Sequence, residues 1–332
     1  MQTQDHPSID CRPAPSRRGH LPGVPRFPVA LLAACFAASW LGAGRAAEPR
    51  QPPIEVPFAD PQKMLDRMFG PTTEEDEKAL ARVEISIQEE RQMGETAVAA
   101  FLAGLKQRNI SVVSRGKDLQ YLRDLVETIR PLMTNGKHYP KLQLYVVQSP
   151  DCEARTFPGG TILFFRGLLE LGGSEAAVAG IVGHELSHLD RGHLLKRARR
   201  VKLAQQAFMG NGGAFSPQRF MEAGTQFAQL WTRPFSPEDE AVADGDGARW
   251  AYQAGYDPRE MAKLFLQVGQ KQKNQRGQVP TFFQSHPDPQ SRHDAVMKVY
   301  EERQKAAPNN ALYVGKENLR LRVARSRREI AE

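Results

Sequence analysis

The chain has 332 residues, of which 40% are hydrophobic and 25% are charged, so it is long enough to bury one large core or two small ones. Its net charge of +7 is modest, and no cluster of basic residues is interleaved with aromatic ones, so the composition excludes an ordinary nucleic-acid-binding surface. Of its three cysteines, only Cys152 lies beyond the first 47 residues, so a chain that has lost this leader cannot form an internal disulfide.

Residues 1–47 have the pattern of an export signal. An apolar run at residues 29–44 follows Arg26 and ends in Gly-Arg-Ala-Ala, which gives the basic flank, the apolar segment and the small-residue cleavage site. Three outcomes stay open: cleavage of the leader, lipid attachment at Cys35 in a Leu-Ala-Ala-Cys lipoprotein box, and retention of the leader as an anchor. We therefore expect an exported protein of the periplasm or envelope, whose association with a membrane depends on an uncleaved or lipidated N-terminus.

A linker and a helical region are expected after the leader. Residues 48–71 are rich in proline, as linkers often are. Residues 72–135 form the expected N-terminal helical region, in which Leu119, Leu122 and Leu125 recur at helical spacing. That spacing predicts one packed helix face.

Strands are a minority in the rest of the chain. Two short stretches, at residues 142–147 and 161–165, are rich in β-branched and aromatic residues and predict strands. Most of the chain from there to residue 304 has helical patterns. The basic C-terminal tail at residues 305–332 has Leu319 and Leu321 as apolar points, and we expect it to form one amphipathic helix.

Residues 184–188 read His-Glu-Leu-Ser-His, and Ser174 ahead of good helix formers predicts that this motif lies on a capped helix. Positions four apart share one face of a helix, so His184 and His188 can present two imidazoles to one metal ion. Glu185 points about 100° further round, where it can reach a metal-bound water instead of the metal. The alternative is a pair of buried core histidines, and a third ligand elsewhere in the chain decides between the two.

A candidate third ligand follows on a second helix. Residues 236–244 read Ser-Pro-Glu-Asp-Glu-Ala-Val-Ala-Asp, in which a Ser cap and a proline at the first helical position predict a helix start. Glu240 and Asp244 share one face of this helix. Glu240 completes a His₂Glu site with an open fourth position, and Asp244 is placed to accept a ring N–H from a ligand histidine. The other acidic residues are more simply explained as a solvated face, to which we assign Glu238, Asp239 and Asp246.

Together these segments resemble the HtpX/BepA-like zinc metallopeptidases, the gluzincin family that also contains the CAAX prenyl proteases. The resemblance covers residues 143–299 and rests on ordered blocks at family-like spacing. These are His-Glu-Leu-Ser-His, Glu-Ala-Val-Ala-Asp, Ala-Gly-Tyr-Asp-Pro and Ser-His-Pro-Asp-Pro-Gln-Ser-Arg, with Pro-Gly-Gly-x-Ile at residues 158–162 and with His193. The resemblance implies a mainly helical α+β fold of the gluzincin type, with an HExxH active-site helix and a small sheet whose edge strand lines the cleft. The catalytic domain would then occupy residues 136–304.

The resemblance implies a metalloendopeptidase with one zinc ion per chain, bound by His184, His188 and Glu240. In such an enzyme a zinc-activated water hydrolyses the peptide bond, and Glu185 takes its proton and later delivers it to the leaving amine. The implied substrates are unfolded or misfolded polypeptides, and the implied role is protein quality control in the envelope.

Two residues near the end of the resemblance acquire supporting roles from it. His286 matches the family position that donates to the tetrahedral oxyanion. Arg292 is expected to orient the loop that carries His286, or to pair with a carboxylate.

The chain departs from the family pattern on the edge strand before the Pro-Gly-Gly block. In the family an Asn-Ala pair contacts the substrate, and the matching pair here is Glu153-Ala154. A carboxylate at that point repels the oxyanion that develops during hydrolysis. Glu153 therefore keeps a second hypothesis open, that of a catalytically weak or inactive chaperone-like binding protein on the same scaffold. The intact ligand set and Glu185 argue for the protease.

Overall fold

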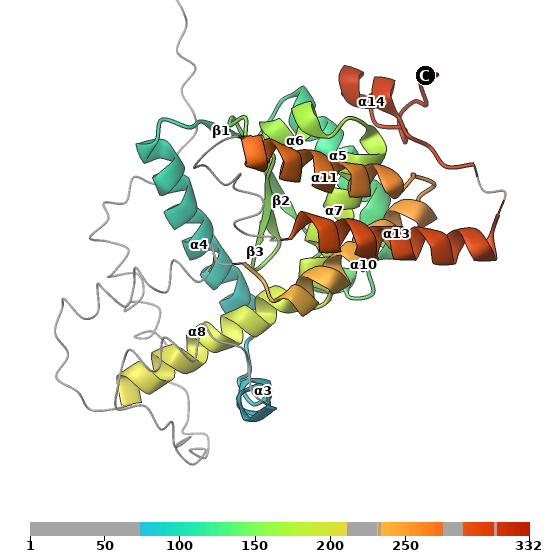
Figure 1. Cartoon of the computed structure of the whole chain (residues 1–332). Helices are drawn as coiled ribbons and strands as arrows, with labels where there is room; N and C mark the ends of the chain where they lie inside the picture. The colour runs from blue at the N-terminus through green and yellow to red at the C-terminus, as the bar shows by residue number, and fades with distance from the viewer. Residues whose placement is uncertain (1–73, 211–230, 232–233, 275–287, 309–310) are drawn as a thin grey trace, which may run out of the picture. The chain divides into compact units, whose positions relative to one another are not determined.

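The computed structural model in Figure 1 describes residues 74–332 except for residues 211–230, 232–233, 275–287 and 309–310. The expected signal segment and the proline-rich linker lie outside the described residues. All described residues belong to one compact unit, which spans Pro53–Glu332.

A small mixed sheet organises this unit. Its strands, in chain order, are β1 (Val112–Val113), β2 (Gln143–Val147), β3 (Ala154–Phe157) and β4 (Thr161–Phe165). Their order in the sheet is β1-β2-β4-β3, with β2 parallel to β4 and the two outer pairs antiparallel. The two strands predicted from the sequence are confirmed as β2 and β4. Because β4 is its only neighbour among the described strands, β3 lies at an edge of the sheet.

The two faces of the sheet pack against different helices. These helices are α4 (Ile87–Gln107), α5 (Lys117–Ile129), α7 (Glu175–Asp190) and α8 (His193–Gly210). Successive strand residues point to opposite faces, so Val146 and Phe164 join the main core with α5 and α7. Phe157 and Leu163 face the other way and pack with α4 and α8. Figure 1 shows α4 and α7 on opposite sides of β2 and β3.

The two helices that carry the predicted motifs begin as the sequence predicts. α7 is buried along its whole length, and Ser174 caps it by accepting from the Ala177 backbone N–H at 3.3 Å. α10 (Pro237–Gln253) packs against α7. Its cap is Ser236, which accepts from the Asp239 backbone N–H at 3.1 Å. Both predicted helix starts are therefore confirmed.

The backbones of α7 and α10 meet at glycines. A Cβ built on Gly247 would lie 2.7 Å from the Gly180 carbonyl oxygen and 2.9 Å from the His184 backbone nitrogen. A Cβ built on Gly183 would lie 2.9 Å from the Gly247 Cα. Only glycine fits so close an approach, and this crossing brings the start of α10 beside the histidines of α7.

Further helices of the described residues are α3 (Glu74–Ala81), α6 (Arg166–Leu171), α11 (Arg259–Asn274), α13 (Pro289–Ala306) and a short C-terminal helix described below, with 3-10 turns η1 (Arg130–Leu132) and η2 (Gly136–His138). The mainly helical α+β class is therefore confirmed. The region at 72–135 contributes β1 to the sheet and α5 to the main core. Its separation from a catalytic domain at 136–304 stays a prediction.

The C-terminal tail is not the single amphipathic helix that the sequence predicts. In its described part, residues 305–306 end α13 and the remaining α-helix is α14 (Lys316–Leu321), flanked by left-handed residues at Gly315 (φ 75°) and Arg322 (φ 52°). Leu319 is buried in the main core, and the Glu175 backbone N–H at the start of α7 donates to the Gly315 carbonyl oxygen at 3.0 Å. These tertiary contacts override the helical spacing of the tail.

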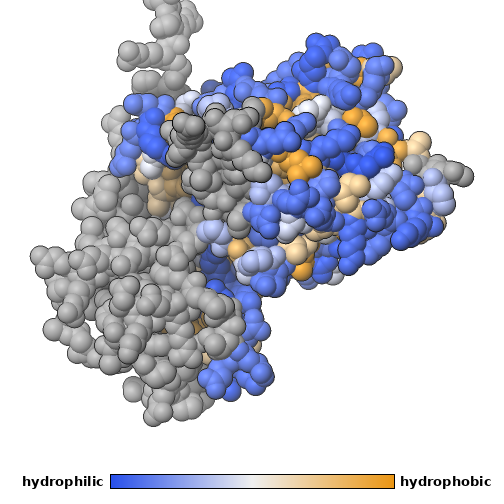
Figure 2. Space-filling model, viewed as in Figure 1, coloured by the Kyte–Doolittle hydropathy of each residue, from blue (hydrophilic) through white to orange (hydrophobic). Residues whose placement is uncertain are grey.

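The visible surface of the described part is mostly hydrophilic, with smaller hydrophobic areas between the polar ones (Figure 2). Among the described residues, no helix combines the length and the apolar composition that crossing a membrane requires.

We expect Gly247→Ala to lower the free energy of unfolding by about 1–3 kcal/mol, because the added methyl group overpacks the crossing of α7 and α10. Gly245→Ala is the matched control on the same helix, where the nearest atom to an added Cβ is Arg249 Nη2 at 3.6 Å. Alanine has the higher helix propensity, so the control should be neutral or stabilising by up to about 1 kcal/mol. Denaturant unfolding measures both, and equal stabilities of the two variants would contradict the close contact.

Candidate metal and catalytic site

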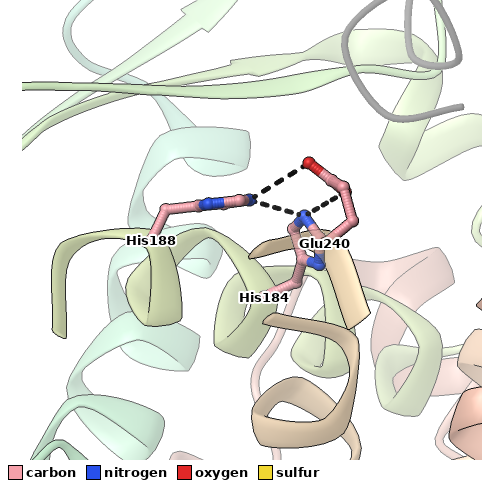
Figure 3. Close-up of side chains that lie close together, drawn as sticks. All are labelled: His184, His188 and Glu240. Atoms are coloured by element: carbon pink, nitrogen blue, oxygen red, sulfur yellow. Dashed lines mark hydrogen bonds and ion pairs between the residues drawn. The ribbon is translucent and has the colours of Figure 1, made fainter. Parts of the chain in front are cut away.

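Three side chains from two helices converge between α7 and α10. His184 and His188 lie on α7 and Glu240 on α10, all three are buried, and their candidate ligand atoms lie within 4.8 Å of one another. The Nε2 atoms of the two histidines are 3.1 Å apart, and each lies 3.6 Å from a carboxylate oxygen of Glu240. Figure 3 shows both rings and the carboxylate turned towards a common point. The structure thus brings together the three residues that the sequence predicts as ligands.

The spacing and chemistry of these atoms fit a small divalent cation. A tetrahedral ion with ligand bonds of about 2.1 Å has ligand atoms about 3.4 Å apart, which lies between the 3.1 Å and 3.6 Å found here. Asp244 Oδ1 lies 2.9 Å from His184 Nδ1 and Arg292 Nη2 lies 3.2 Å from it. An ionised carboxylate can only accept, so the shorter contact favours the tautomer with the ring proton on Nδ1 and the lone pair on Nε2. A lone pair and a carboxylate that face each other repel unless a cation lies between them.

A buried ion pair holds the outer nitrogen of His184. Asp244 Oδ1 accepts from Nδ1 at 2.9 Å, and Arg292 donates to both carboxylate oxygens of Asp244, at 2.6 and 2.8 Å. Burial opposes ionisation of Asp244, but Arg292 outweighs it and lowers the pKa of Asp244 to about 2. Burial also lowers the pKa of His184, which favours the neutral ring that metals bind. Arg292 therefore pairs with a carboxylate, while His286, whose loop it was expected to orient, lies outside the described residues.

The outer nitrogen of His188 contacts a third histidine. His188 Nδ1 and His193 Nδ1 are 3.0 Å apart, and His193 Nε2 lies 3.6 Å from Asp239 Oδ1. The His188 ring stacks on Phe235 with centroids 3.9 Å apart, and the Arg197 guanidinium lies 3.9 Å from the Phe235 centroid. The sequence gives His193 no role beyond the resemblance. It gives no signal for Phe235, because no local spacing links that residue to the motif.

Glu185, the expected general base, is buried beside the ligands. Burial raises the pKa of Glu185 to about 7, and a hydrogen bond from Thr156 opposes the rise. Thr156 Oγ1 donates to Glu185 Oε2 at 2.6 Å. Because Thr156 belongs to β3, the edge strand touches this carboxylate, a contact that no sequence pattern predicts.

A neighbouring arginine neutralises Glu153. The Glu153 side chain is buried, and Arg155 Nε donates to its carboxylate at 2.9 Å. The Arg155 guanidinium lies 5.0 Å from the Phe101 ring centroid on α4. Alternate strand residues point to opposite faces, so Glu153 and Arg155 face α4 while Thr156 faces α7. Arg155 therefore offsets the repulsion that an unpaired Glu153 would cause, and Ala154 is buried at the start of β3.

The assignment of Asp246 to a solvated face is wrong. Asp246 is fully buried and accepts from Ser187 Oγ at 2.9 Å and from Arg191 Nε at 2.6 Å. Ser187 lies on α7 and Arg191 directly follows its last residue, so the charge of Asp246 is compensated across the contact between α7 and α10. Of the other two acidic residues, Glu238 is exposed as predicted and Asp239 is partly buried.

Comparison with known sequences finds both a family and individual relatives. Residues 120–299, more than half of the chain, match the model of Peptidase family M48. The Beta-barrel assembly-enhancing protease of Yersinia pestis is 29% identical over 157 residues, which cover 45% of this chain and 32% of that protein. The protein of the same name from Escherichia coli strain K12 is 24% identical over 220 residues, which cover 63% of this chain and 43% of that protein.

A mitochondrial relative has a similar match. Metalloendopeptidase OMA1, mitochondrial, of Bos taurus is 28% identical over 155 residues, which cover 43% of this chain and 29% of that protein. The chain thus spans less than half the length of each of these three relatives.

We expect Arg155→Met to destabilise the protein by about 3–5 kcal/mol, because it leaves the Glu153 carboxylate buried without its partner. The side chains of Glu153 and Arg155 are only 2% and 11% exposed, so water cannot replace the lost contact. The double variant Glu153→Gln/Arg155→Met removes both charges and should recover most of the loss. Denaturant unfolding of the single and double variants tests this, and additive effects would show that the two residues are not coupled.

Proposed function

The chain belongs to peptidase family M48, and on that basis we propose that it is a zinc-dependent metalloendopeptidase acting on unfolded or misfolded polypeptides in the cell envelope. The observation that carries the proposal is the convergence of His184 and His188 from one helix with Glu240 from another. Glu185, buried next to His184 in the same motif, supplies the group that such a hydrolase needs to move a proton.

Zinc, one ion per chain, is the metal that this donor set favours. Two imidazoles and one carboxylate form the three-ligand set typical of catalytic rather than structural zinc sites. A bound zinc ion would supply a Lewis acid that polarises the scissile carbonyl and lowers the pKa of a water molecule.

The residues of the chain handle the proton and the orientation of the ligands. Glu185 takes a proton from the attacking water and returns it to the nitrogen of the leaving amine. Such a group works best with a pKa near ambient pH. In the metal-free chain, burial raises the pKa of Glu185 to about 7. Asp244, fixed by Arg292, holds the ring proton of His184 on Nδ1. The family resemblance alone supports His286 as the donor to the oxyanion.

We propose that the substrate binds along the edge of β3 that pairs with none of the described strands. An extended peptide can add to a strand edge through main-chain hydrogen bonds. Thr156 of β3 touches Glu185, so a peptide lying along this edge, which starts at Ala154 directly after Glu153, would pass beside the proposed base. A strand edge accepts only an extended segment, which supports unfolded polypeptides as the substrate class.

We propose that the protein acts after export, in the periplasm or envelope. The support is the export pattern of residues 1–47 and the names of two relatives, which refer to β-barrel assembly. Mass spectrometry of the N-terminus of the protein from its native cells tests this. Cleavage after the Gly-Arg-Ala-Ala segment indicates a free protein, and a lipid on Cys35 indicates a tethered one. An intact leader on protein in the cytosol would contradict export.

Three substitutions separate metal binding from catalysis. Glu240→Ala removes a ligand and should lose most of the zinc and the activity. Glu185→Gln keeps the shape but removes the base, so about one zinc per chain should remain while casein cleavage falls by about two orders of magnitude or more. Glu238→Ala is the matched control, because Glu238 is exposed on the same helix as Glu240, and it should behave as wild type. Elemental analysis and a casein assay measure the two properties.

The same measurements test the rival hypothesis of a chaperone-like binding protein. That hypothesis predicts that wild type and Glu185→Gln both hold zinc, bind unfolded polypeptide and cleave nothing. The hypothesis rests on repulsion between the Glu153 carboxylate and the developing oxyanion, and Arg155 offsets that repulsion. Full retention of zinc in Glu240→Ala would refute the ligand assignment, and unchanged cleavage by Glu185→Gln would refute the mechanism.

A further inference from the structure

A threonine on the edge strand holds one oxygen of the proposed base. Thr156 Oγ1 lies 2.6 Å from Glu185 Oε2 and 3.4 Å from the Glu185 carbonyl oxygen. The two residues are 5% and 1% exposed, so bulk water does not compete for the contact. A distance of about 2.5–2.7 Å is typical of a hydroxyl that donates to an ionised carboxylate. The contact to Oε2 is therefore the strong one.

The strand that carries Thr156 is fixed at its far end. β3 pairs with β4, and the turn that joins them is anchored to α4. There the buried Glu90 accepts from the Gly159 backbone N–H at 3.1 Å and from the Tyr139 hydroxyl at 2.9 Å. The Thr156 hydroxyl thus reaches Glu185 from a strand whose backbone cannot shift without breaking the contacts to Glu90.

We propose that Thr156 is a positioning residue for the reaction: its hydroxyl fixes Glu185 Oε2 against β3, so that proton transfer runs through the other carboxylate oxygen, Oε1. This inference rests on the proposed function, in which Glu185 is the general base. A base must hold its accepting oxygen within hydrogen-bond reach of the proton that it takes, and a glutamate side chain has several rotatable bonds. Securing one oxygen removes that freedom and leaves the carboxylate in a single orientation.

The same contact ties the base to the strand where the substrate is proposed to bind. A peptide paired with β3 and the Glu185 carboxylate would both be hydrogen-bonded to the same strand. The position of the peptide relative to the carboxylate would then be set by β3. Small misplacements of a reacting group can cost about 100-fold in rate, so loss of the hydrogen bond to β3 should measurably lower the rate of the reaction.

The alternative is that Thr156 only fills space between β3 and α7, and two substitutions separate these roles. Valine has nearly the shape of threonine without the hydroxyl, whereas serine keeps the hydroxyl and lacks the methyl group. Thr161 on β4 supplies the matched control, because it is a threonine of the same sheet that is also 5% exposed.

With a peptide substrate and the zinc-loaded full chain, we expect Thr156→Val to lower kcat by about 10–100-fold and to change KM by less than about 2-fold. Thr156→Ser should stay within about 3-fold of wild type in kcat, and Thr161→Val should match wild type. Zinc affinity, measured by competition with a chelator, should be the same for all of them, because none of these side chains is a proposed ligand.

A second measurement needs neither zinc nor activity. In metal-free protein, the hydrogen bond should couple Thr156 to Glu185 in the unfolding equilibrium. The fold-change that Thr156→Val causes in the unfolding constant should then differ by about 5-fold or more between the wild-type background and a Glu185→Ala background, which has no side-chain acceptor. Thr161→Val should cause the same change in both backgrounds.

The outcomes distinguish this inference from the proposed function. Normal kcat in Thr156→Val beside an inactive Glu185→Gln would overturn the role of Thr156 and leave the protease intact. Equal losses in Thr156→Val and Thr156→Ser, with no coupling to Glu185, would show that packing and not the hydroxyl matters. Full activity of Glu185→Gln would overturn the proposed mechanism, and the role of Thr156 with it.

Discussion

The contact between α7 and α10 sets the distance on which the candidate site depends. Gly183 and Gly247 bring the two backbones so close that neither position has room for a Cβ. Glu240 precedes Gly247 by about two helical turns and Asp244 precedes it by about one, so all three lie on the same side of α10. The side of α10 that touches α7 therefore carries both the carboxylate that faces the histidines and the carboxylate that supports one of them. A wider crossing would move both out of reach together.

Charge balance constrains the same cluster. Burial raises the pKa of Glu185 and of Glu240 to about 7, so ionising both at once costs free energy. Arg292 lies 3.8 Å from Glu240, but its close hydrogen bonds go to Asp244. A divalent cation among the ligand atoms would offset the remaining negative charge and favour ionised Glu240. Binding of a metal ion would therefore change the protonation equilibrium of Glu185, because both depend on the charge of Glu240.

Local signals account for what the sequence could predict. The caps at Ser174 and Ser236 and the four-residue spacing of the motif depend on neighbours in the chain, so helix starts and candidate ligands follow from pattern alone. The partner of a buried polar group depends instead on elements that are far apart in sequence. Asp246 looks like a surface acid until Arg191, at the C-terminal end of α7, lies beside it, and Thr156 has no evident role until β3 lies against α7.

The departure at Glu153 depends on strand register in the same way. Residues two apart on a strand point to the same face, so a strand assignment already pairs Glu153 with Arg155. A shift of one residue would turn that pair towards α7 and Thr156 away from it. The side of the sheet to which the pair points can therefore be predicted only when the register of β3 is known. In the observed register the edge strand presents a neutralised ion pair towards α4 and a hydroxyl towards Glu185. Glu153 therefore lies on the face opposite to the one that meets Glu185, and its charge does not point at the proposed base.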